Sequence, residues 1–121
     1  MTSTREKGVN SEEIAVEHLV KNGYMVMERN WYSSHHEIDI IAVKDNVLVV
    51  IEVKSLFSNY IQEPYKAVNR NKQQMIISAA NAYIRQNNVN NEVRFDVISI
   101  LLSTKEPIIE HIENAFYPRV R

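Results

Sequence analysis

Residues 35–55, "HHEIDIIAVKDNVLVVIEVKS", decide the fold. Residues 37–44 and 47–55 are rich in Ile and Val and are separated by a short polar turn, so they predict two antiparallel strands joined as a hairpin. Asp39, Glu52 and Lys54 interrupt the apolar pattern of these strands. Either the three charges face water on a half-exposed hairpin, or they meet in a site.

The spacing of these charges favours a site. Side chains alternate along a strand, so Glu52 and Lys54 share one face. A turn near Asp45 places Asp39 roughly opposite Glu52, with Cβ atoms about 5 Å apart. Facing carboxylates repel each other unless a cation lies between them, and hard oxygen ligands suit Mg²⁺. Lys54 would then stand beside the metal, where it can hold an attacking water or stabilise charge on a phosphate.

Two predicted helices each carry a charge on their apolar stripe. The segment "NSEEIAVEHLVKNG" has Asn10 as a possible N-cap and Gly23 as a stop, and Glu12 lies on its apolar stripe. A longer helix is predicted from Pro64, with Lys72 on its stripe. Each charge has an ordinary alternative, since the helix dipole favours acids in a first turn and lysines snorkel at the edge of a stripe. Four breaks of pattern, two on the facing strands (Asp39 and Glu52) and two on the helices (Glu12 and Lys72), together favour a site.

The remaining segments complete an α/β architecture. Residues 24–32, 93–102 and 107–116 predict further strands, the last of them short. The long helix then connects the third and fourth strands, which favours a parallel crossover in a mixed central sheet flanked by helices. A chain of 121 residues suits one domain. We therefore expect a flexible N-terminal tail over residues 1–9 and a single domain over residues 10–121.

Composition restricts the function classes. The chain has no cysteine, which excludes disulfides and thiolate chemistry. No apolar stretch approaches the roughly 20 residues that span a bilayer, and the N-terminus carries no apolar signal segment. These features predict a cytoplasmic protein that does not insert into a membrane.

Local charge leaves nucleic-acid binding open. The net charge is −1, whereas nucleic-acid-binding domains usually carry a basic excess. Lys66, Arg70 and Lys72 nevertheless form a cationic cluster. The adjacent His35 and His36 cannot share one face of a strand, so a zinc site there is weakly supported. We expect this pair in a loop, where it contacts a substrate phosphate or solvent.

The chain resembles the PD-(D/E)xK nuclease superfamily through Asp39, followed after twelve residues by Glu52, Val53 and Lys54. More closely, it is similar to the YraN-like family of uncharacterised bacterial proteins. That likeness covers residues 8–117 and is carried by "GVNSEEIA", "NGY", "ERNW", "HHEIDIIA", "VVIEVKS", "PYKAVNRNK" and "RFDVI".

The resemblance implies a restriction-endonuclease-like α-β-β-β-α-β core and a metal-dependent endonuclease that hydrolyses DNA phosphodiesters. The chain is similar also to archaeal Holliday-junction resolvases. Branched or structured DNA is the expected substrate, because a single compact domain with few base-reading elements cannot specify a long sequence. The implied ligands of Mg²⁺ or Mn²⁺ are Asp39, Glu52 and the backbone carbonyl of Val53. A homodimer would suit a two-fold target. The resemblance further implies catalytic roles for Glu12, Lys54 and Lys72. The residues expected to contact nucleic acid are His36, Lys66, Arg70 and Gln73.

The chain departs from the family pattern in three places, and the departures at residues 35–36 and 56, together with the net charge of −1, favour an alternative function. Ser11 replaces a glycine, His35 and His36 replace a Gly-Gly pair, and Leu56 stands where a basic residue often lies. The loss of a cation at position 56 removes a possible phosphate contact. The alternative is a catalytically inactive nuclease-fold module that binds nucleic acid or a protein partner.

Overall fold

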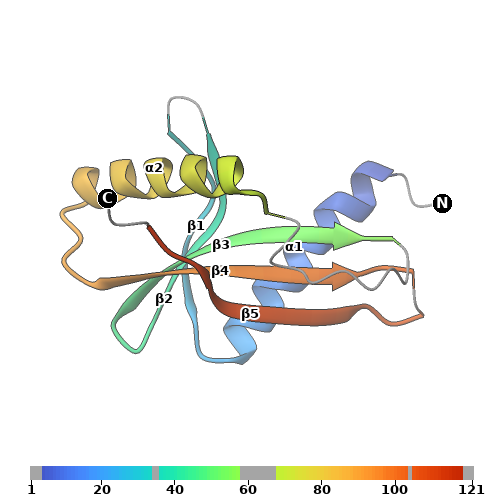
Figure 1. The fold of residues 1–121 in the computed structure, drawn as a ribbon. Coiled ribbons are helices and arrows are strands. Elements are labelled where there is room, and N and C mark those ends of the chain that lie inside the picture. The colour runs from blue at the N-terminus through green and yellow to red at the C-terminus, as the bar shows by residue number, and fades with distance from the viewer. Residues whose placement is uncertain (1–3, 34–35, 58–67, 104, 119–121) are drawn as a thin grey trace.

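The computed structural model describes residues 4–33, 36–57, 68–103 and 105–118. Within these residues, two helices and five strands follow one another in the predicted order (Figure 1). Their bounds are α1 Thr4–Lys21, β1 Met25–Tyr32, β2 Glu37–Lys44, β3 Val47–Leu56, α2 Arg70–Gln86, β4 Glu92–Leu101 and β5 Ile108–Phe116. Within this described part of the chain, neither helix is both long enough and apolar enough to span a membrane.

The five strands form one mixed sheet in the order β1-β2-β3-β4-β5. β3 and β4 are parallel, because α2 carries the chain back across the sheet between them, and the other neighbours are antiparallel. The predicted α/β fold, with a mixed sheet flanked by helices, is therefore confirmed. The order of the helices and strands is consistent with a restriction-endonuclease-like core.

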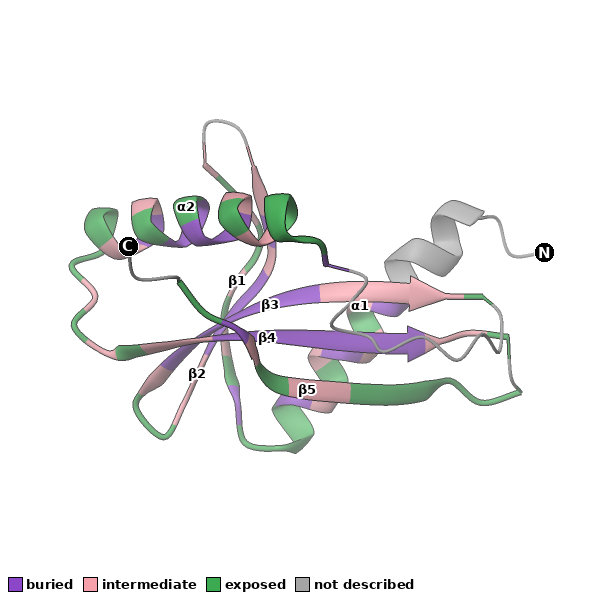
Figure 2. Cartoon of the chain, in the orientation of Figure 1, coloured by how far each residue is buried: buried purple, intermediate pink, exposed green. Residues whose placement is uncertain are grey.

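The two helices cover opposite faces of the sheet. Alternate residues of β3 divide between them: Leu48 and Val50 pack in the core under α2, whereas Val49 and Ile51 pack in the core under α1. Figure 2 shows that buried residues run along β3 and β4, while much of β5 is exposed at the sheet edge. The centre of the sheet is thus closed to water on both faces.

The β2–β3 hairpin has the predicted register. Its turn residues, Asp45 and Asn46, have φ values of 50° and 66°. These left-handed conformations are typical of a two-residue turn that matches the twist of the flanking strands, and Asp and Asn tolerate them. The ladder pairs Ile40 with Ile51, so the next position places Asp39 opposite Glu52.

The first helix begins earlier than the sequence suggests. It starts at Thr4, so residues 4–9, which were expected in the tail, are helical, and Asn10 lies inside the helix instead of capping it. Residues 5–7 are strong helix formers and no proline precedes Asn10, so nothing ends the helix there. The preference of Asn for a cap is outweighed by continuation of the helix.

The second helix begins later than predicted. It starts at Arg70 and not at Pro64, which lies outside the described residues together with Lys66. Asn69 caps it, with extended backbone and a side-chain oxygen that accepts the N–H of Lys72 at 2.8 Å. Because the helix begins after this cap, Val68 lies before α2. Its side chain is nevertheless buried in the core beneath α2.

Gly23 ends α1 in a left-handed conformation with φ of 88°, as the sequence predicts. The N–H of Tyr24 donates to the carbonyl of Leu19 at 2.9 Å, which closes the helix end. We expect Gly23→Ala to lower the free energy of unfolding by about 1 kcal/mol, because a Cβ disfavours this conformation. Urea denaturation measures the loss. Gly23→Asn should lose less, and equal stability of Gly23→Ala and wild type would contradict this account.

Candidate functional site

Asp39 and Glu52 lie together on the sheet face covered by α2. Their carboxyl groups are hydrogen bonded to each other. The backbone N–H of Val53 also donates to Oδ2 of Asp39 at 2.8 Å. Only 6% of Glu52 is exposed, so the pair is largely removed from water. The hairpin thus brings together the two carboxylates that its register predicts.

Burial sets the protonation of this pair. It raises the pKa of Glu52 to about 7, and the charge of Asp39 contributes to the rise. Burial likewise raises the pKa of Asp39, although the hydrogen bond from Val53 opposes it. Two interacting acids titrate as a unit, so this pair takes up its first proton at a higher pH than two exposed carboxyl groups would.

Two lysines lie near the carboxyl group of Glu52. The Nζ atom of Lys72, in the first turn of α2, lies 3.6 Å from Oε2 of Glu52. Lys54 follows Glu52 by two residues along β3 and therefore shares its face. The charges of both lysines oppose the rise in the pKa of Glu52. The structure thus places Lys54 and Lys72 beside the carboxyl pair.

Glu12 approaches the pair from α1 but is held by β1. Its Oε1 atom accepts from Asn30 Nδ2 at 2.8 Å and from Arg29 Nη2 at 3.1 Å. Asn30 has a left-handed backbone, with φ of 52°, which a non-glycine residue seldom adopts. The charge of Glu12 contributes to the raised pKa of Asp39, so the two acids are electrostatic neighbours. Glu12 lies at the margin of the site.

The sequence reasoning missed Glu37. This residue begins β2 and is half-buried. Burial raises its pKa, and the charges of Asp39 and Glu12 raise it further, whereas the charge of Lys72 lowers it. Glu37 therefore belongs to the same acidic neighbourhood. The signal that could have found it is its spacing of two residues from Asp39, which favours the same side of the strand.

The structure describes only some of the residues that are predicted to contact nucleic acid. Arg70 is exposed at the start of α2, whereas Lys66 lies outside the described residues. Gln73 donates from its amide to the carbonyl of Val68 at 2.9 Å, which ties α2 to the preceding segment. The carbonyl of His36 accepts the N–H of Ser33 at 2.9 Å. The contacts of these residues with nucleic acid stay predictions.

The side chains present suit a hydrated magnesium ion better than a cage of protein ligands. Among the described residues, no three His, Asp or Glu side chains are arranged to hold a metal. Mg²⁺ is commonly held by one or two carboxylates and keeps several waters, so Asp39 and Glu52 suffice for that mode. The Val53 carbonyl stays a predicted third ligand. The donor set and its raised pKa values fit Mg²⁺ or Mn²⁺.

Comparison with known proteins identifies the family. The model of the family described as "Uncharacterised protein family UPF0102" matches residues 11–100. A UPF0102 protein of Parabacteroides distasonis is 40% identical over 121 residues, which cover 100% of both chains. Another, of Flavobacterium psychrophilum, is 41% identical over 117 residues, which cover 97% of this chain and 98% of the relative. The chain therefore belongs to the UPF0102 family.

Proposed function

We propose that this protein is a Mg²⁺- or Mn²⁺-dependent nuclease of the PD-(D/E)xK type that hydrolyses DNA phosphodiesters. The observation that carries the proposal is the buried Asp39–Glu52 pair with two lysines beside it. Burying two acids against each other costs stability, and such costly arrangements are concentrated at binding and catalytic sites. Sites that assemble such a pair on a rigid sheet are suited to holding a divalent cation.

The side chains divide the work of hydrolysis. Asp39, Glu52 and the Val53 carbonyl would hold the cation, which supplies Lewis-acid chemistry and a more acidic bound water. Lys54 orients the attacking water and stabilises the charge that develops on the phosphate. Lys72 balances the charge of Glu52. Water adds across one P–O bond, which leaves a phosphate monoester on one strand end and a hydroxyl on the other.

Branched or structured DNA is the proposed substrate. A single small domain has few elements with which to read base edges, so shape is the more accessible signal. A homodimer would present two such sites to the two strands of a duplex or a junction. The presence of Arg70 at the start of α2, near Lys72, supplies positive charge for the phosphate backbone.

Cleavage assays test the proposal. The protein is incubated with Mn²⁺ and a panel of linear, nicked, flapped and four-way DNA, and the products are separated on denaturing gels. We expect cleavage of a branched substrate, and at least tenfold slower cleavage by Lys54→Ala, because the attacking water loses its partner. Lys21→Ala, on the exposed end of α1, is the matched control. No cleavage of any substrate, or equal rates for Lys54→Ala and wild type, would overturn the enzyme proposal.

One observation favours a second candidate function. Oε1 of Glu12 already accepts hydrogen bonds from Arg29 and Asn30, so this oxygen has protein partners in the absence of a metal. A nuclease fold that binds nucleic acid without cutting it is compatible with this arrangement. Fluorescence anisotropy with the same DNA panel separates the two functions, since binding without cleavage in Mn²⁺ supports the binding module.

A further inference from the structure

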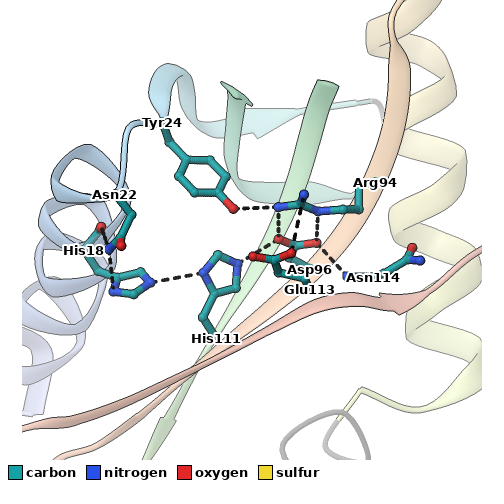
Figure 3. A network of polar contacts seen from close by, with 8 residues as sticks. All are labelled: His18, Asn22, Tyr24, Arg94, Asp96, His111, Glu113 and Asn114. Carbon is teal, nitrogen blue, oxygen red and sulfur yellow. Dashed lines mark hydrogen bonds and ion pairs between the residues drawn. The ribbon is translucent and has the colours of Figure 1, made fainter. Parts of the chain in front are cut away.

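A second polar cluster lies on the opposite face of the sheet, under α1 (Figure 3). It joins His18 of α1, His111 of β5 and Asp96 of β4. Asp96 alternates with Ile98 and Ile100 of the core under α1, whereas Glu52 lies on the face covered by α2. The cluster is therefore separate from the candidate nuclease site.

Asp96 fixes the orientation of the His111 ring. Nε2 of His111 lies 2.7 Å from Oδ2 of Asp96, which is fully buried. Burial alone would raise the pKa of Asp96, but hydrogen bonds from His111, Arg94 and the N–H of Asn114 hold it below its ordinary value. An ionised Asp96 accepts, so Nε2 of His111 carries hydrogen, and in the neutral form of the ring the lone pair is then on Nδ1.

That lone pair faces the second imidazole. Nδ1 of His111 lies 3.1 Å from Nε2 of His18, and the two rings are inclined at 68°. Burial, and then the charge of His111, lowers the pKa of His18, so this ring is neutral near pH 7. Two nitrogens bound to one tetrahedral metal ion lie about 3.3–3.4 Å apart. The separation of the two nitrogens is therefore close to the one that a shared ion would require.

Both rings already have partners on their outer sides. Metal-bound histidines usually donate their other N–H to a carboxylate or a similar group, which fixes the ring and raises its basicity. Asp96 plays this part for His111. Nδ2 of Asn22 lies 3.5 Å from Nδ1 of His18 and also donates to the carbonyl of His18 at 2.7 Å. To accept a hydrogen from Nδ1, this amide would have to turn its oxygen toward the ring. The cluster thus has, at His111, the outer contact of a metal-bound histidine as well as the two facing nitrogens.

We propose that His18 and His111 bind a borderline-soft divalent metal ion, of which Zn²⁺ and Ni²⁺ are the probes used below. Imidazole favours such ions over Mg²⁺, which prefers oxygen. Among the described residues no third His, Asp or Glu completes the set, so water fills the other positions. On binding, the hydrogen of Nε2 of His18 moves to Nδ1, and no net proton is released. The ion then cross-links α1 to β5.

Calorimetric titration of tag-free protein with Zn²⁺ and with Ni²⁺ at pH 7.5 tests the proposal. Because the Asp39–Glu52 pair is itself a candidate cation site, we expect one binding event per chain at the His18–His111 pair beside any at that carboxyl pair. Occupation of the histidine pair should raise the melting temperature, because a ligand of the native state stabilises it. His18→Gln, which spares the contact between His111 and Asp96, should lose both effects. Mg²⁺ should produce neither effect at this site.

Two control variants make the result specific to the cluster. His36→Gln removes a histidine of the β1–β2 loop, and Glu52→Gln alters the other candidate site, so both should keep the Zn²⁺ binding that depends on His18. The proposal is overturned if wild type binds neither ion, if His18→Gln binds as well as wild type, or if Glu52→Gln abolishes binding. None of these outcomes depends on nuclease activity.

Discussion

Replacing Asp96 with alanine is expected to lower the free energy of unfolding by about 3–5 kcal/mol, because the partners of a buried charge are left unpaired. Asp96 accepts hydrogen bonds from both Nε and Nη2 of Arg94 at 2.9 Å, and from the N–H of Asn114 at 2.9 Å. His111 donates to it as well. Urea denaturation at pH 7, followed by far-UV circular dichroism, measures the loss.

A second acid in the same cluster is the control. Glu113 lies 3.7 Å from Nη1 of Arg94, but its side chain is 61% exposed. Exposed ion pairs contribute little, so Glu113→Ala should cost less than about 1 kcal/mol. A smaller loss for Asp96→Ala than for Glu113→Ala would contradict the assignment of Asp96 as the centre of the cluster.

The effect of Asp96 should also depend on pH in a defined direction. Its folded-state pKa lies below the ordinary value of 3.8, so its contribution is present above that value. As pH falls through the folded-state pKa, Asp96 is protonated in both states and the contribution is lost. The difference between wild type and Asp96→Ala should therefore shrink only in strong acid.

Replacing Glu52 with glutamine is expected to stabilise the metal-free protein at pH 8, in contrast to most substitutions of buried residues. The pKa of Glu52 is about 7 in the folded state and 4.5 in the unfolded state. Between these values the folded state binds more protons, so the stability of wild type falls as pH rises. The total fall is at most about 3 kcal/mol. Glu52→Gln lacks this fall because its amide does not ionise.

Chemical denaturation at pH 4.5 and pH 8 measures this effect. Glu110→Gln, on the exposed part of β5, is the matched control and should follow the wild-type profile. Added Mn²⁺ should stabilise wild type at pH 8 more than it stabilises Glu52→Gln, since the cation is attracted to the two carboxylates that are ionised at this pH. Parallel stability profiles for wild type and Glu52→Gln would show that Glu52 is not held in an unfavourable charged state.

The hairpin could be predicted because its information is local. The period of two assigns the faces of β2 and β3, and the polar turn sets the register, so Asp39 and Glu52 had to oppose each other. The sequence also identified Lys54 and Lys72 as neighbours of this pair. It was less successful with helix ends: a proline at residue 64 and an asparagine at residue 10 are permissive signals, and the actual boundaries depend on competing caps and on propensity.

The second cluster could not be found in this way. His18 and His111 are separated by 93 positions, and each looks like an ordinary polar residue of its own element. They meet only because β5 pairs with β4 at the sheet edge while α1 crosses the same face. The sequence by itself determined the elements, their faces and the carboxylate pair of one hairpin, since these follow from backbone periodicity. The tertiary structure alone decided which distant polar groups share a desolvated space, because that depends on sheet order and helix packing.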